Sequence, residues 1–322
     1  VGAPGARRAF VFFGQVAYQD FARRLSETGD FDHTIDSMPS GSVLPVVNED
    51  LDRDDGFGEI VASAGDVNGD GYDDVAIAAP TAKKSRGRVY VLYGGPDSGR
   101  RLSDGLCCDT IDVREAITLT GRAGFYVEGD TPDDFLGSAV AGGLDFDGDG
   151  RDDLLIGVDG YDDGVGAALL LYGQRDDFYG TEIRFGDVAA QGGPVNPRGL
   201  LIRAKDRTVA SPVGQPAGIG GAVASLDDVN GDGADDIIVG ADGYARTGAA
   251  FVIFGGAKLA GTFRVDELDA SQGFAIVGAS KGDQCGAGVG KAGDFNGDGY
   301  GDVIVGAPGV RHRRGEAYVV YG

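Results

Sequence analysis

The sequence is poor in several residue types, and each shortage narrows the range of functions. The 322 residues include no tryptophan, one methionine, two histidines and three cysteines. An odd cysteine count argues against a complete disulfide framework, although one bridge from Cys107 or Cys108 to Cys285 stays open. Neither His33 nor His312 lies near a serine or cysteine in a pattern typical of a catalytic triad. We therefore expect surface histidines and a protein that is not an enzyme.

Basic residues and long apolar segments are also scarce. Twenty-eight lysines and arginines face 51 aspartates and glutamates, which gives a formal net charge of −23. Such a charge repels nucleic acids and anionic membranes and attracts cations. No apolar run approaches the length of a membrane span. The first residues show neither an initiator methionine nor a signal-peptide pattern, so we expect a processed product or a fragment of a longer array.

Glycine and aspartate are abundant and recur in a fixed pattern. The chain has 59 glycines without a collagen-like period of three. Four nine-residue segments repeat one acidic, glycine-containing motif: Asp66–Asp74, Asp145–Asp153, Asp228–Asp236 and Asp294–Asp302. A strand-like apolar run follows each motif, and an aromatic strand ending in glycine follows that run. This spacing predicts a repeated structural unit.

Each unit is interpreted as a four-stranded antiparallel meander whose acidic loop joins the first and second strands. The fourth strand is the least regular; its candidates are Thr110–Gly121, the third unit's EIRFGDV or GLLIRA, and Gly273–Gly278. The surplus residues 123–134 and 187–218 are interpreted as insertions. Asp20–Gly29 is the best candidate for a short helical turn.

Such meanders cannot bury their faces alone, and radial packing of the units gives a β-propeller. The fold class is therefore all-β, with four complete repeats and a partial fifth in one domain, either complete or part of a larger propeller or array. The approximate units are 1–46 (partial), 47–121, 122–203, 204–278 and 279–322. His33–Val46 is a candidate for the missing fourth strand of the last unit, which would close a ring.

The acidic loops have the ligand order of a hard-cation site. Counted from the first aspartate, positions 1, 3, 5 and 9 offer carboxylate or amide oxygens, position 7 a backbone carbonyl, and position 6 is a glycine. This is the order of the first nine positions of an EF-hand loop. The expected ligands are Asp66, Asn68, Asp70, Tyr72 and Asp74; Asp145, Asp147, Asp149, Arg151 and Asp153; Asp228, Asn230, Asp232, Ala234 and Asp236; Asp294, Asn296, Asp298, Tyr300 and Asp302.

Oxygen-only ligands on an irregular loop favour Ca²⁺ over Mg²⁺ or the soft metals. Two carboxylates about 5 Å apart repel by roughly 3 kcal/mol at an effective dielectric constant of about 20, so each loop needs a counter-charge. We expect about four structural Ca²⁺ sites. The second loop, with four carboxylates, is expected to bind most tightly.

The repeat resembles the FG-GAP repeat, which is found in the N-terminal β-propeller of integrin alpha subunits and in bacterial surface proteins. The resemblance rests on Phe57-Gly58, on the acidic loops, on Gly306-Ala307-Pro308 and on the aromatic strands. Leucine, isoleucine and Cys285 replace the phenylalanine in the other units, so Cys285 is expected to be a small buried residue. The integrin propeller has seven blades, more than this chain supplies.

The resemblance implies an extracellular or cell-surface module for adhesion, protein interaction or surface assembly. The alternative is a glycan-binding accessory module of a secreted polysaccharide-active enzyme. Two basic clusters, Lys83–Arg88 and Arg311–Gly315, fall between the second and third strands and should lie opposite the acidic loops. In integrins the face opposite the cation loops binds the ligand. A protein or glycan partner there, and self-association into fibres or layers, are therefore expected.

Overall fold

A computed structural model shows an all-β chain. It describes residues 55–95, 111–113, 117, 123–174, 182–190, 198–205, 216–256 and 259–322, together with strands at 2–3, 8–12 and 43–47. The expectations for Asp20–Gly29, His33, Cys107 and Cys108 lie outside these residues. Among the described residues, none of the helices has the length and apolarity needed to span a bilayer.

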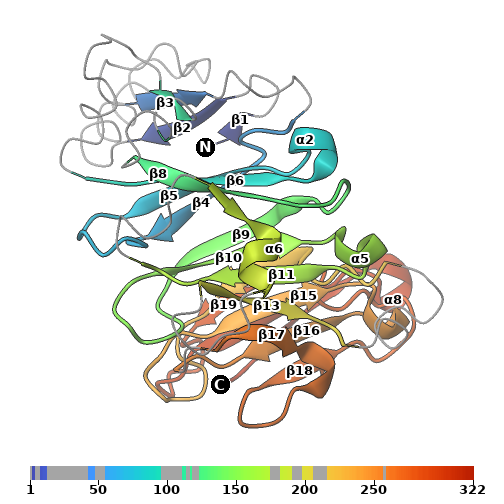
Figure 1. Ribbon diagram of the computed structural model, residues 1–322. Coiled ribbons are helices and arrows are strands. Elements are labelled where there is room, and N and C mark those ends of the chain that lie inside the picture. Colours follow the sequence, from blue (N-terminus) through green and yellow to red (C-terminus); the bar gives the residue numbers. More distant parts are fainter. Residues whose placement is uncertain are drawn as a thin grey trace, which may run out of the picture.

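The strands form five sheets, here called sheets 1 to 5, that follow one another along the chain (Figure 1). Sheet 1 contains β1 (Gly2–Ala3), β2 (Arg8–Phe12), β3 (Val43–Val47) and β7 (Ile111–Asp112). Sheet 2 contains β4 (Ile60–Gly65), β5 (Asp74–Ala79), β6 (Arg88–Leu92), β8 (Gly124–Glu128) and β12 (Glu182–Arg184). Sheet 3 contains β9 (Leu136–Leu144), β10 (Asp153–Val158), β11 (Ala167–Leu171), β13 (Gly199–Arg203) and β17 (Gly261–Arg264).

The last two sheets have four and three strands. Sheet 4 contains β14 (Ala222–Ser225), β15 (Ile237–Ala241), β16 (Ala249–Ile253) and β18 (Gly273–Val277). Sheet 5 contains β19 (Gly288–Gly293), β20 (Asp302–Ala307) and β21 (Glu316–Val320). The short helices are α2 (Ala82–Ser85), α5 (Tyr161–Gly164), α6 (Phe185–Ala190), η3 (Tyr244–Arg246), η4 (Val265–Glu267) and α8 (Val310–Arg313).

Within sheets 2 to 5, the first to fourth strands of a repeat pair antiparallel with their neighbours, as the repeat predicts. The strands after the acidic loops and the aromatic strands lie where the sequence places them, for example β10 beside β11 with Ile156 opposite Leu169. β13 and β18 are the fourth strands of sheets 3 and 4, which confirms two of the candidates.

The fourth strand of sheet 2 was predicted wrongly. It is β8, within the segment interpreted as an insertion, and it pairs with β6. It also falls after residue 121, so sheet 2 extends beyond the expected 47–121 unit. Ile111–Asp112 instead forms β7 and pairs with β3 of sheet 1. Val43–Val47, which covers the end of the segment expected to close the last unit, pairs with β2.

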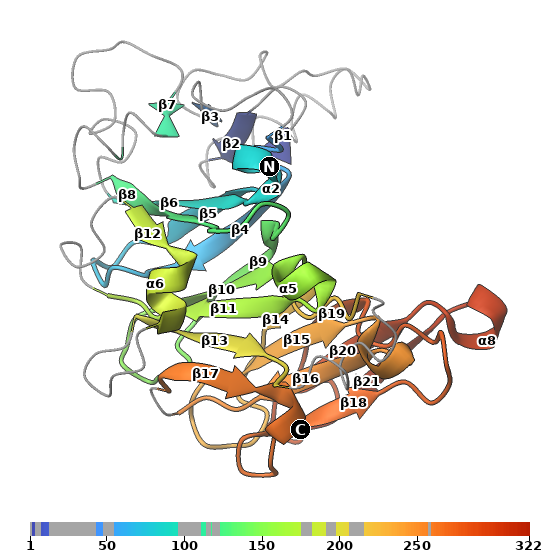
Figure 2. The ribbon, with the colours of Figure 1, turned by 45° about the vertical axis from the view of Figure 1, so that its right-hand side comes forward.

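In the part of the chain that the structure describes, the segment between the third and fourth strands of a repeat also joins two neighbouring sheets at their outer edges. β7, β12 and β17 each leave their own repeat and add a parallel strand to the outer strand of the preceding sheet (Figure 2). Beside β12, buried Glu128 of β8 pairs with Arg88 of β6, and its Oε1 lies 2.6 Å from Nη1 of Arg184. These ion pairs therefore hold β12 in register beside β8.

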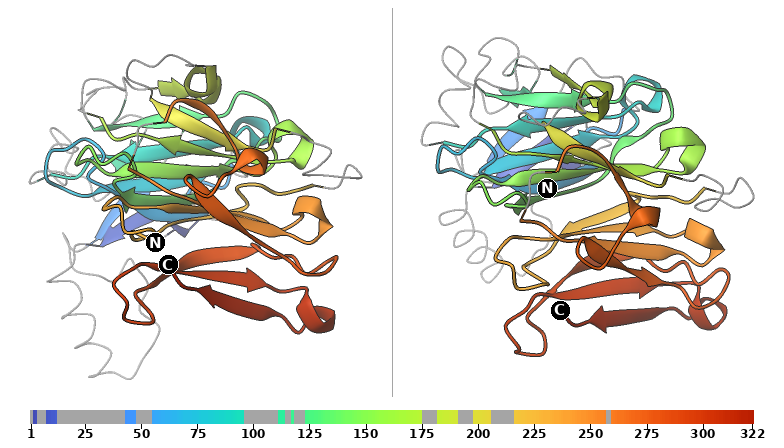
Figure 3. Two further views of the ribbon diagram at one scale, coloured as in Figure 1. Left: turned by 90° about the horizontal axis from the view of Figure 1, so that it is seen from below. Right: turned by 60° about the horizontal axis from the view of Figure 1, so that its bottom comes forward.

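The cores lie between consecutive sheets rather than within one layer (Figure 3). Alternation along β10 directs Leu154, Ile156 and Val158 towards sheet 2 and Leu155 towards sheet 4. Ile238 of sheet 4 meets Val303 and Val305 of sheet 5 in the last core. These side chains are at most 2% exposed, so each interface contributes hydrophobic stabilisation.

A glycine before the third strand is required where one sheet meets the next. Gly166 has φ +82° and forms a bridge with Ile219 of the following repeat. A Cβ atom on Gly166 would lie 2.2 Å from the carbonyl oxygen of Ile219. Gly87 and Gly248 form the equivalent bridges with Leu136 and Cys285.

We expect Gly166→Ala to lower the free energy of unfolding by roughly 3 kcal/mol or more, because it adds both backbone strain and a clash with the next sheet. Gly143→Ala is the matched control, since Gly143 has φ +71° but open space around its Cβ position. The control should cost about 1 kcal/mol. Chemical denaturation measures both, and equal losses would contradict the packing argument.

Candidate metal centres

Each acidic loop joins the first and second strands of its sheet. The loops lie between β4 and β5, β9 and β10, β14 and β15, and β19 and β20. The structure thus places all four predicted ligand sets at equivalent points of four successive sheets. They are numbered here by position 1 to 9 from their first aspartate, as in the sequence.

The aspartate at position 1 organises the loop by accepting two backbone N–H groups. In the first loop, the amide of Asp70 lies 3.0 Å from Asp66 Oδ1 and that of Gly71 lies 2.7 Å from Asp66 Oδ2. The same two bonds occur in the other three loops at 2.8 to 3.1 Å. The glycine at position 6 has φ between +85° and +96° in every loop, a conformation suited to glycine.

Positions 3 and 5 continue this pattern. Asn68 Oδ1 accepts the amide of Asp70 at 2.8 Å, and Asp70 Oδ1 accepts the amide of Tyr72 at 3.0 Å. The oxygens of positions 1, 3 and 5 are therefore gathered on one tight loop. In the second loop one carboxylate oxygen each from Asp145, Asp147 and Asp149 lie within 4.8 Å of one another. The other loops have asparagine at position 3, so they form no carboxylate trio.

The aspartate at position 9 ties the loop to the sheet. Asp153 is fully buried; its Oδ2 accepts the amide of Phe146 at 2.9 Å and its Oδ1 that of Gly173 at 2.7 Å. The equivalent aspartates of the other loops make the same two bonds at 2.7 to 3.1 Å. Position 9 thus joins the loop to the end of the third strand, a role that the repeat alone did not indicate.

Burial disfavours the ionised form of the carboxylates at position 9. Burial raises the pKa of Asp74 and of Asp153 from 3.8 to about 8, and that of Asp236 to about 6. The aspartates at positions 1 and 5 of the same loop raise the pKa of Asp74 and of Asp236 further by repulsion. The donor set therefore fits a hard cation, which would offset this repulsion. The carbonyls at position 7 and the carboxylates at position 9 remain predicted ligands.

The second loop carries a positive charge of its own. The guanidinium of Arg151, at position 7, lies 2.7 Å from Asp149 Oδ2. Its stem lies beside Gly69 of the preceding loop, 3.1 Å from a Cβ built there. Arg151 therefore offsets part of the charge that led us to expect the tightest binding at this loop.

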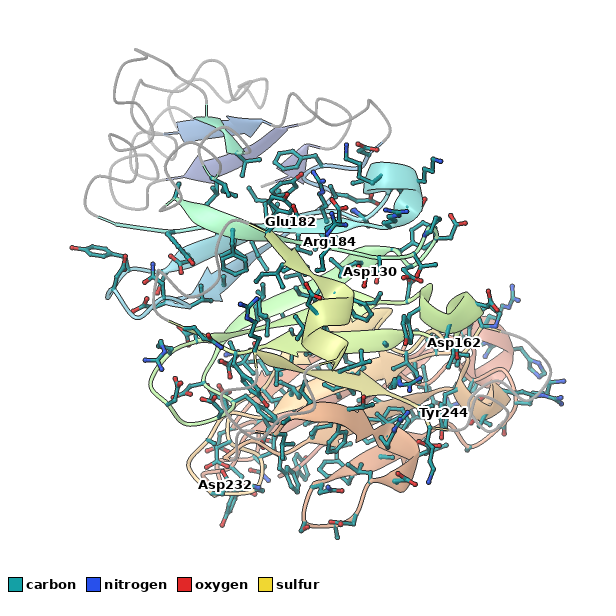
Figure 4. All side chains as sticks on the ribbon, in the orientation of Figure 1. Asp130, Asp162, Glu182, Arg184, Asp232 and Tyr244 are labelled. Carbon is teal, nitrogen blue, oxygen red and sulfur yellow. The ribbon has the colours of Figure 1, made fainter. Side chains whose placement is uncertain are left out.

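The turns between the second and third strands lie at the other end of the sheets. Figure 4 shows Asp232 of an acidic loop on one side and Asp162 and Tyr244 of such turns on the other. Consecutive residues in these turns take left-handed conformations, with φ +55° at Lys83, for example, and +65° at Lys84. Left-handed backbone at non-glycine residues costs roughly 1–2 kcal/mol each.

Other predicted residues are placed as follows. Lys83, Lys84 and His312 are exposed, whereas Arg88 is buried against Glu128. Cys285 is a buried free thiol in the place of the repeat's phenylalanine, as expected.

Without divalent cations, we expect the free energy of unfolding to fall as pH rises from 3.8 towards 8. In this range the native state keeps protons on Asp74 and Asp153 that the unfolded state has released, so the folded state is increasingly disfavoured. Thermal unfolding in chelator at several pH values measures the slope. Asp153→Asn removes one titrating group and should make the slope shallower; a stability that rises with pH throughout would contradict this assignment.

Comparison with known proteins agrees with the repeat seen in the structure. The FG-GAP repeat matches residues 57–92, 136–171 and 286–321. The remaining unit, with Ile219 in place of the phenylalanine, has the same order of first, second and third strands.

Several integrin alpha chains are similar to part of this chain. Integrin alpha pat-2 of Caenorhabditis briggsae is 37% identical over 131 residues, which is 40% of this chain and 9% of that protein. The Caenorhabditis elegans protein of the same name is 32% identical over 198 residues, covering 59% of this chain and 14% of that protein. Integrin alpha-5 of Xenopus laevis is 33% identical over 107 residues, covering 33% and 9%.

The chain therefore spans only a small part of these relatives. The repeats, their strand order and the shared acidic loops lead to one conclusion: the chain carries FG-GAP repeats and is similar, over part of its length, to integrin alpha chains.

Proposed function

We propose that the chain is a calcium-binding β-propeller module that acts in adhesion, protein interaction or surface assembly outside the cell or at its surface. The observation that carries the proposal is the acidic loop, which recurs in four sheets with one hydrogen-bond pattern. In each loop the carboxylate at position 9 is buried and lies in the same loop as other acidic side chains. Similarity to integrin alpha chains supports the choice of an adhesion or interaction module over an enzyme.

Calcium is the cation that suits these loops best. Their side-chain donors are oxygen atoms, and a flexible loop tolerates the irregular coordination that Ca²⁺ accepts and Mg²⁺ does not. About four ions, one per loop, are proposed, with positions 1, 3, 5 and 9 and the carbonyl of position 7 as ligands.

A propeller arrangement follows from the way the sheets are joined. Cores lie between consecutive sheets, and outer strands pass from one repeat to the edge of the sheet before it. FG-GAP repeats support radial packing of such sheets as blades.

Two surfaces suit a protein partner. The strained turns opposite the acidic loops expose Lys83, Lys84 and Arg313, which would attract an acidic ligand. Sheet 5 exposes Ile304 and Tyr318, and the adjoining Phe295 of the fourth acidic loop is 67% exposed, which favours packing against another protein or self-association. The glycan-binding alternative has no support from the relatives.

Calcium should stabilise the fold strongly. At tenfold excess over the dissociation constant each site adds roughly 1.4 kcal/mol, and four sites add about 5–6 kcal/mol. We expect the melting temperature to rise by about 8 °C between chelator and millimolar Ca²⁺. Differential scanning calorimetry measures this shift, and an unmoved melting curve would refute the proposal.

Two variants sharpen the calcium test. Asp66→Asn removes a ligand charge and should reduce the shift by about one site's share. Asp163→Asn makes the same change on an exposed turn opposite the loops and should leave the shift intact. If the second variant lost as much as the first, general surface charge would account for the effect.

Arg151→Gln should raise the calcium affinity of the second loop about three- to tenfold, because the guanidinium on Asp149 opposes the incoming cation. Glutamine keeps the stem that covers Gly69. Hydrogen exchange of the 145–153 segment during a calcium titration measures the affinity. Arg314→Gln, an exposed change at the opposite end, is the control; an affinity that falls in the Arg151 variant would show that Arg151 supports the site.

A further inference from the structure

The aspartate at position 8 contacts the acidic loop of the preceding sheet rather than its own. Asp152 Oδ2 accepts the amide of Asp66 at 2.7 Å, and the amide of Asp152 donates to the carbonyl of Asp66 at 3.1 Å. Asp66 occupies position 1 of the first loop. The side chain that fixes its backbone therefore comes from the second loop.

The same contact recurs at the next junction. Asp235 of the third loop accepts the amide of Asp145, position 1 of the second loop, at 3.0 Å. The first junction also shows how closely the loops fit. A Cβ on Gly65, just before Asp66, would lie 2.2 Å from Asp152 Oδ2, so only glycine leaves room for this carboxylate.

The junction between sheets 4 and 5 is built differently. Position 8 is Gly301, whose amide donates to the carbonyl of Asp228 at 2.7 Å, but there is no carboxylate for the amide of Asp228. Asp227 occupies that space instead: a Cβ on Gly301 would lie 3.0 Å from the Cβ of Asp227. Asp227 Oδ1 lies 3.4 Å from Nζ of Lys291.

We propose that Asp152 and Asp235 are positioning residues that couple calcium binding between neighbouring loops, so that the first three loops bind cooperatively and the fourth binds independently. The proposal rests on the proposed function and adds to it how the sites communicate. Each of these carboxylates holds the position-1 residue of one loop and directly precedes the position-9 anchor of its own loop.

An ordered conformation of one acidic loop therefore favours an ordered conformation of the neighbouring loop. Asp152 also interacts electrostatically with both Asp66 and Asp145, the position-1 aspartates of the two loops that it joins. A cation bound in the second loop lowers the negative charge around Asp152 and fixes its backbone, which presents Asp66 for binding. Because binding free energies are linked, the first loop promotes binding in the second by the same factor.

The test is a calcium titration of the full chain followed by hydrogen exchange in each acidic loop. In Asp152→Asn, the calcium concentration that half-protects residues 66–74 should rise about tenfold, whereas that of residues 294–302 should not change. A general loss of stability would shift both segments. Equal shifts, or none, would overturn the proposal.

Asp73→Asn is the matched control. Asp73 holds position 8 of the first loop, so the change removes one charge at the equivalent position of the reporting loop and leaves the carboxylate of Asp152 on the amide of Asp66. We expect residues 66–74 to shift less than about twofold in this variant. A shift as large as that of Asp152→Asn would assign the effect to local charge and overturn the coupling.

A gain-of-coupling variant tests the same idea in the other direction. Asp227→Gly combined with Gly301→Asp recreates the Gly65–Asp152 arrangement between the third and fourth loops. Residues 228–236 should then reach half protection at a severalfold lower calcium concentration than in Asp227→Gly alone. No difference between these two variants would overturn the proposal.

Two further outcomes are separable. Should Asp152→Asn fail to fold, Asp149→Asn removes a ligand from the second loop instead; it must weaken protection of residues 66–74 and spare residues 294–302, and any other pattern overturns the coupling. If wild-type loops show no calcium-dependent protection, the proposed function fails and the coupling fails with it.

Discussion

The buried aspartate at position 9 is the interaction on which the rest of the structure depends. With one carboxylate it holds the amide of position 2 and the amide that follows the third strand, and so it connects the acidic loop to the body of the sheet. A neutral side chain of the same size cannot accept both N–H groups, because an amide offers one acceptor and one donor. The fold therefore favours a carboxyl group at this position, and under the proposed function a bound cation would stabilise its ionised form, which accepts both N–H groups.

Much of this could be predicted from the sequence because the repeat is dense. Fixed spacing located the acidic loops, and the apolar runs after them became β5, β10, β15 and β20. Replacement of the repeat's phenylalanine by Cys285 correctly indicated a buried residue. These features recur at the same place in each unit, and such recurrence leaves a periodic pattern in the chain.

Contacts between units left no such pattern. β8 was interpreted as an insertion because β7, which precedes it, is equally strand-like and belongs to the sheet before. Likewise, position 8 is an aspartate in three loops, and sequence alone gives no reason to separate it from other solvated acids. Its partner is an amide in the preceding repeat, 86 residues away for Asp152, and an amide carries no residue-specific signal. Only Gly65, which has to yield space to Asp152, hints at the contact.

The acidic loops and the sheet interfaces are two parts of one stabilising system. The first strands of sheets 2 and 3 enter the loops that carry position 1, and the carboxylate at position 8 of the next loop returns to each of them from the neighbouring sheet. Repulsion within a loop therefore acts on the interface between two sheets as well as on the loop itself. A chain with a net charge of −23 has only 28 basic residues to relieve this repulsion, and those of α2 and α8 lie in the turns between second and third strands, away from the acidic loops. Under the proposed function, external divalent cations would supply the missing positive charge, and ion binding and cohesion of the sheets would then be governed by the same equilibrium.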